Sequence, residues 1–159
     1  FTRLAEQPLD RWLAGQPPGT LVAQFPLARA LNGSSLYRAV VHGQPMAYGH
    51  GTFYPTAYMA AKQVLDRFPS AETLDLLSSW GVRYIIVGAG AYQAGWGDQR
   101  GQNWEEVADQ IAQSGRLRLV YAAQERPVWH DERVGDLIRG CLPEVPVVAD
   151  RVQVYELIP

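Results

Sequence analysis

The sequence predicts a single α/β domain, a layered sandwich in which a mostly parallel sheet of four to five strands carries helices on both faces. Two observations support this fold class. Residues 70–90 join the clearest helix pattern to the clearest strand pattern through one glycine, and helical and extended patterns alternate along the rest of the chain. Such alternation favours parallel strands with helical connections. The length of 159 residues suits one domain, spanning 1–159.

Residues 70–90 form the centre of the predicted fold. Leu74 and Leu77 are spaced for one buried helix face, and Ser70 precedes them as an N-cap. Gly81 can adopt the left-handed conformation that ends a helix. The following run, YIIV at residues 84–87, has no polar alternation, which indicates a central strand covered on both faces.

The remaining elements follow from apolar spacing and from glycine and proline punctuation. In chain order, the patterns predict helices over 8–15, 36–41, 56–68, 104–114 and 131–140, and strands over 20–25, 117–121 and 152–158. Leu117, Leu119 and Tyr121 alternate with polar or small residues, so we expect the 117–121 strand to bury one face. The direction of the last strand stays open. Residues 88–102 are rich in glycine and are expected to form a loop.

Composition excludes several classes of protein. Fourteen basic and sixteen acidic residues give a net charge of −2 without a basic stripe, so no nucleic-acid partner is expected. Cys141 is the only cysteine, which excludes an internal disulfide and a multi-thiolate metal site. No apolar run approaches the roughly 20 residues of a membrane span. Because the chain starts at Phe1, we expect a fragment of a longer protein.

The strongest candidate site lies in residues 42–55, which read HGQPMAYGHGTFYP and cannot form a regular element. Aromatic faces, hydroxyls and imidazoles in this segment could bind a sugar or a lipid head group. The candidate ligand-binding residues are His42, Tyr48, His50, Phe53 and Tyr54, with Tyr58 at the start of the next helix. The alternative, which aromatic residues beside glycines favour, is that the rings cover the edge of the sheet.

A nucleotide site is a second possibility, because Gly88 and Gly90 follow the central strand as they do in dinucleotide-binding turns. The spacing does not complete that motif, since Gln93 occupies the position of the third glycine. A simple connection is therefore favoured, although a stand-alone nucleotide- or small-molecule-binding module using this loop stays open.

No catalytic residue, metal site or cofactor is predicted. His42, His50 and His130 lack the spacing of helical metal ligands, and hydrogen-bonded loop histidines are the simpler interpretation. The chain contains no G-x-S-x-G nucleophile elbow. Cys141 has no neighbouring histidine in sequence, which indicates an inert thiol.

Short segments in a fixed order carry a family resemblance. They are Trp12-Leu13-Ala14, Gln16-Pro17, Phe25-Pro26-Leu27, His42-Gly43-Gln44-Pro45, Gly49, Phe53-Tyr54-Pro55, Phe68-Pro69, Leu74, Leu77, Gly81-Val82-Arg83-Tyr84 and Val154-Tyr155-Glu156-Leu157. In this order the chain resembles the C-terminal soluble domain of polytopic bacterial membrane glycosyltransferases of the GT-C type, relatives of the protein mannosyltransferases.

The resemblance implies a function that composition alone does not indicate. In that family the acidic catalytic residue lies in the membrane part, near the first membrane helices, and that part is absent from this sequence. The resemblance therefore implies a non-catalytic accessory domain at the cell membrane, on the extracytoplasmic side. Its implied partners are the membrane-embedded part of the same polypeptide and a glycan or lipid-linked sugar. A purely structural interaction domain is the remaining alternative.

Overall fold

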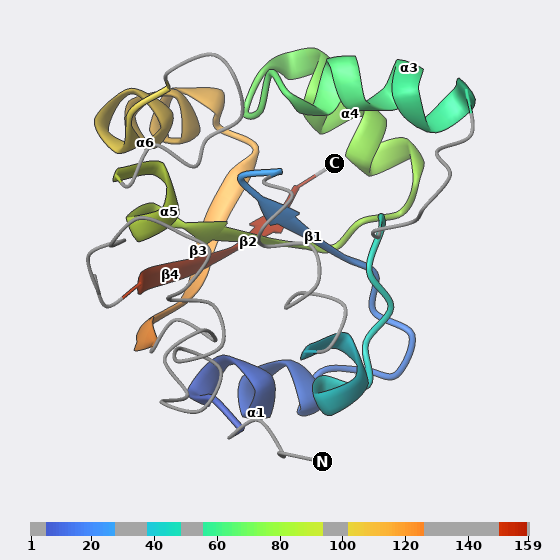
Figure 1. The fold of residues 1–159 in the computed structure, drawn as a ribbon, viewed down its shortest axis with the longest axis vertical. Helices are drawn as coiled ribbons and strands as arrows, with labels where there is room; N and C mark the ends of the chain where they lie inside the picture. Colours follow the sequence, from blue (N-terminus) through green and yellow to red (C-terminus); the bar gives the residue numbers. More distant parts are fainter. Residues whose placement is uncertain (1–5, 28–37, 49–55, 94–101, 126–149, 159) are drawn as a thin grey trace, which may run out of the picture.

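The computed structural model describes residues 6–27, 38–48, 56–93, 102–125 and 150–158. The helices are α1 (Pro8–Ala14), α3 (Thr56–Leu65), α4 (Ala71–Ser79), α5 (Ala89–Gln93) and α6 (Trp104–Ser114). The strands are β1 (Val22–Phe25), β2 (Tyr84–Gly88), β3 (Leu117–Glu125) and β4 (Asp150–Leu157). Figure 1 shows the sheet between α1 on one side and α3, α4 and α6 on the other. The predicted α/β class, with helices on both faces, is confirmed.

The strand order is β1-β2-β4-β3, and this order shows that the prediction of a mostly parallel sheet is wrong. Only β1 and β2 pair in parallel, whereas β4 pairs antiparallel with both β2 and β3. The physical reason is the position of β4. It lies between β2 and β3 and replaces a parallel contact with two antiparallel ones. The last strand, whose direction the sequence left open, is antiparallel to its neighbours.

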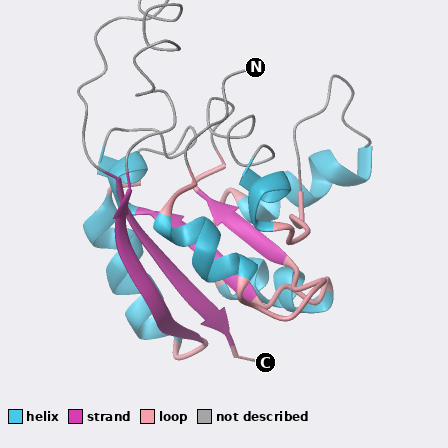
Figure 2. Ribbon diagram, turned by 90° about the horizontal axis from the view of Figure 1, so that it is seen from below, coloured by secondary structure: helices cyan, strands magenta, loops and turns pink. Residues whose placement is uncertain are grey.

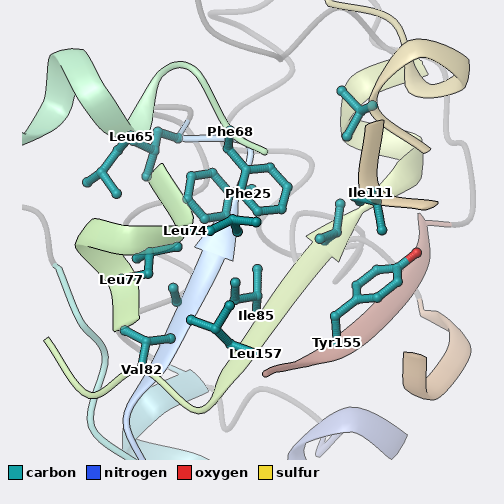
Figure 3. Close-up of a cluster of buried hydrophobic side chains, with 14 of the residues drawn as sticks. Phe25, Leu65, Phe68, Leu74, Leu77, Val82, Ile85, Ile111, Tyr155 and Leu157 are labelled. Carbon is teal, nitrogen blue, oxygen red and sulfur yellow. The ribbon is translucent and has the colours of Figure 1, made fainter. Parts of the chain in front are cut away.

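The central strand β2 is buried along its whole length, as predicted. Ile85 and Val87 point to the face covered by α3, α4 and α6, and Tyr84 and Ile86 point to the face covered by α1. Figure 3 shows the larger of the two cores, in which side chains from the sheet meet those of the helices. The alternation explains the unbroken apolar run: each successive side chain enters a different core.

The predicted helix ends are confirmed by hydrogen bonds and backbone angles. The Ser70 hydroxyl accepts from the backbone N–H of Thr73 at 3.3 Å, and the Asn103 side chain accepts from the N–H of Glu106 at 2.9 Å. Gly81 and Gly115 follow α4 and α6 with φ of 79° and 63°. These angles lie in the left-handed region, where a side chain would be strained.

Two local predictions are wrong. Residues 89–93 form the short helix α5 instead of a loop, because Ala89, Ala91 and Tyr92 are buried and tertiary packing outweighs the low helix propensity of glycine. The expected alternation of β3 is also broken. A register shift between Leu119 and Tyr121 places Tyr121 against the α1 side, opposite Leu117, and leaves Leu119 50% exposed.

Some predicted elements lie partly or wholly outside the described residues. The helix expected over 131–140 is one of them, and of the helix expected over 36–41 the structure describes the part from residue 38, which is helical to residue 42. Figure 2 shows the described helices and strands from a second direction. Within the described ranges, no helix combines the length and the apolarity needed to cross a membrane.

Candidate functional site

Residues 42–48, the first half of the candidate segment, lie along the outer edge of β1. The backbone N–H of Val22 donates to the Pro45 carbonyl at 3.0 Å, and the N–H of Ala47 donates to the Val22 carbonyl at 2.7 Å. Met46 thereby forms an isolated parallel bridge with Val22. These contacts satisfy backbone groups that an edge strand would otherwise expose.

Tyr48 continues this cover with its side chain. Its hydroxyl accepts from the backbone N–H of Gln24 at 2.7 Å and donates to the Gln24 carbonyl. Its ring meets Phe25 edge-on, with centroids 6.1 Å apart. Burial of the hydroxyl raises the pKa of Tyr48 well above its usual value. The hydroxyl therefore stays protonated and is occupied by the backbone of β1.

His42 belongs to a buried polar cluster between α1 and residues 42–48, which follow the outer edge of β1 and are called the edge segment below. Its Nδ1 accepts from the backbone N–H of Gln44 at 3.1 Å, so the proton of the neutral imidazole lies on Nε2. Burial lowers the pKa of His42. Asp10 opposes this shift and Arg38, which pairs with Asp10 at 2.9 Å, adds to it. His42 thus acts as a neutral hydrogen-bond acceptor.

The lowered pKa of His42 predicts a pH-dependent stability. Because the unfolded histidine binds its proton more readily, the contribution of the neutral ring is complete above the ordinary histidine pKa of 6.5 and is lost as pH falls through the lower folded pKa. We expect the free energy of unfolding in urea to decrease as the pH is lowered from neutrality into the acid range. His42→Asn, whose amide oxygen can replace Nδ1 without titrating, should flatten this slope. An equal slope in both proteins would contradict the assignment.

The other candidate residues are not brought together by the described structure. Tyr58 is partly buried on α3, near enough to the Tyr48 hydroxyl to raise the Tyr48 pKa slightly. His50, Phe53 and Tyr54 lie outside the described residues, as do His130 and Cys141. In the part of the chain that the structure describes, no three His, Cys, Asp or Glu side chains are grouped to hold a metal ion.

The glycines of the possible nucleotide loop are part of regular structure. Gly88 is the last residue of β2 and pairs with Val152 of β4, and Gly90 is buried inside α5. α5 has only five residues, so it offers little of the helix dipole that dinucleotide-binding turns use.

A pocket that the sequence patterns do not predict lies at the carboxyl end of β1. Its cavity volume is about 10 Å³, room for about one water molecule. Its lining residues come from four separate segments: Phe25, Pro26, Leu27, Leu65, Asp66, Phe68, Tyr92 and Gln102. In open α/β sheets ligands bind outside the carboxyl ends of parallel strands. The only signal in the sequence was therefore topological: the pocket lies where the parallel pair β1–β2 ends.

The pocket combines aromatic rings with a few polar groups. Phe25 and Phe68 stack with centroids 4.0 Å apart, and Figure 3 shows the two rings together at one end of the core. The Gln102 side chain donates to the Phe68 carbonyl at 3.3 Å. The Asp66 carboxylate accepts from Lys62 at 2.8 and 2.9 Å. Phe25 and Phe68 are each 1% exposed, and the polar groups beside them are engaged within the fold.

No protein-family profile matches the sequence, and no curated protein matches it significantly.

Proposed function

We propose that the chain is a non-catalytic, extracytoplasmic accessory domain of a membrane glycosyltransferase that uses a lipid-linked sugar, and that it assists the binding of acceptor or glycan. The proposal rests on the ordered sequence segments that resemble this family, and the structure adds that Gln44 and Tyr48, in the candidate segment, are hydrogen-bonded to the backbone of the fold.

The engaged state of the polar side chains supports a binding role over a catalytic one. Tyr48 bonds to the backbone of Gln24, and Asp66 bonds to Lys62. A general acid or base needs a perturbed pKa and access to a reacting atom. Tyr48 has the perturbed pKa, but its hydroxyl is held by the strand. The chemistry is therefore assigned to the membrane-embedded part of the same polypeptide.

The proposal is tested by assaying the isolated chain for sugar transfer. The chain is incubated with a radiolabelled polyprenyl-phosphate sugar and a peptide or glycan acceptor, and the transferred label is counted. We expect no transfer above the background of a heat-denatured sample. Turnover by the isolated chain would overturn the non-catalytic assignment.

A further inference from the structure

The strand pairing brings several distant segments together at one end of the sheet. Tyr84, at the start of β2, and Arg118, near the start of β3, both pair with Glu156, near the end of β4. β1 also begins there, because it pairs in parallel with β2. Figure 2 shows β4 finishing at this end, beside the C-terminus. The segments that meet there, called the amino end of the sheet below, are residues 80–83, 115–118 and 156–158.

Two large apolar side chains are exposed at the amino end of the sheet. Trp80, which caps the C-terminus of α4, is 37% exposed, and Ile158, which follows β4, is 40% exposed. The backbone N–H of Ile158 donates to the Arg116 carbonyl at 2.8 Å, and the N–H of Leu157 donates to the Arg83 carbonyl at 2.9 Å. The segment that carries Ile158 is therefore fixed against both neighbouring strands.

Three arginines lie at the same end. Arg83 and Arg118 both pair with the Glu156 carboxylate, Arg83 at 3.5 Å, and their side chains are 50% and 66% exposed. Arg116 pairs with Asp75 of α4 at 2.6 Å. Because one carboxylate serves two guanidinium groups, the cluster around Glu156 keeps one uncompensated positive charge. This local excess of positive charge occurs in a chain whose net charge is −2.

Apolar side chains beside exposed arginines suit a surface that contacts anionic lipid. Tryptophan favours the head-group region of a bilayer, and arginine bonds to phosphate oxygens. The strength of such a contact grows with the apolar area inserted and with the attraction between cations and anionic lipid. A stable protein interface would need roughly 1,000 Å² or more of buried surface. Two exposed apolar side chains provide too little for that, but they are enough for a weak, reversible contact with lipid.

We propose that the amino end of the sheet is a docking surface for a bilayer that contains anionic lipid. Trp80 and Ile158 enter the head-group region, and the exposed guanidinium groups of Arg83 and Arg118 bond to lipid phosphates. The inference goes beyond the proposed function, because it requires no sugar and assigns the end of the sheet that faces the membrane.

The test is sedimentation of the chain with vesicles of phosphatidylcholine alone or of equal parts phosphatidylcholine and phosphatidylglycerol. Arg118→Gln leaves Glu156 paired with Arg83 alone and so removes the excess charge, and Ile158→Ser removes one apolar contact. The matched controls are Arg67→Gln and Met59→Ser, at exposed positions on or just after α3. Urea unfolding checks that each variant is folded.

We expect the chain to bind the anionic vesicles, to bind phosphatidylcholine alone at least about fivefold more weakly, and to be released as salt is raised. Arg118→Gln should weaken binding to the anionic vesicles about fivefold, the value of one cation beside such a surface. Ile158→Ser should weaken it about threefold or more, because less apolar surface leaves water. Both control variants should bind like the wild type.

Absence of binding to the anionic vesicles would overturn the inference, as would equal binding to both lipid compositions or an equal loss in the control variants. Light scattering tests the alternative of a second copy: self-association that Ile158→Ser abolishes would assign this surface to a protein contact and overturn the lipid assignment. None of these outcomes depends on sugar transfer, whose detection with the isolated chain marks failure of the proposed function.

Discussion

Replacing Phe25 with alanine is expected to lower the free energy of unfolding by about 3–5 kcal/mol, the range for a large aromatic side chain removed from a packed core. Phe25 is 1% exposed, stacks on Phe68 and meets the Tyr48 ring edge-on. Figure 3 shows it at the meeting point of β1 and the α3–α4 region. Loss of the Phe25 ring removes its contact with Phe68 in the core and its contact with Tyr48 in the edge segment.

Equilibrium unfolding in urea measures this change, and Met59→Ala is the control. Met59 lies on α3 and is 48% exposed, so its truncation should change stability by less than about 0.5 kcal/mol. A loss below about 1 kcal/mol for Phe25→Ala would mean that the ring stack does not organise this part of the core.

Gln44→Glu is expected to destabilise the domain by at least about 3 kcal/mol at neutral pH, because it places a carboxylate against two carbonyl oxygens. The Gln44 side chain donates to the carbonyls of Leu13 and Gln16 at 3.0 and 3.1 Å, and accepts from the backbone N–H of Thr20 at 3.0 Å. Glutamate keeps the shape and the acceptor but removes both donors. One buried side chain thus ties α1 and the following turn to the edge segment.

The control for this change is Gln113→Glu, at an exposed position of α6, where the same substitution should be nearly neutral. The loss at Gln44 should also shrink as the pH falls into the acid range, because protonation restores one donor to the carboxyl group. A loss that does not depend on pH would show that the cluster responds to packing rather than to charge. Urea unfolding at each pH measures both effects.

The sequence predicted the parts of the fold that depend on local chemistry. Ser70, Asn103, Gly81 and Gly115 mark helix ends because caps and left-handed glycines act within a few residues. The YIIV run at residues 84–87 predicted a buried central strand, because burial on both faces removes polar alternation.

The parts that depend on distant residues could not be predicted. An apolar strand reveals that both of its faces are covered but not the direction of its neighbours, so the insertion of β4 was missed. The bulge in β3 reverses the side-chain alternation after Leu119, and the residues around it carry no sequence pattern that predicts a bulge. The pocket joins Phe25, Phe68 and Tyr92 across three separate segments, and only their assembly shows that Tyr92 lines it.

The position of β4 has a consequence for how the protein is made. β4 is the last strand in chain order, yet it separates β2 from β3 in the sheet. During synthesis, β2 and β3 leave the ribosome before β4, which pairs with both of them, so one edge of β2 and one edge of β3 stay without their partner strand until β4 is made. The four-stranded sheet is complete only after residues 150–157 have been synthesised. Because these pairings join residues far apart in the sequence, we expect folding to be slow and to depend on this last strand.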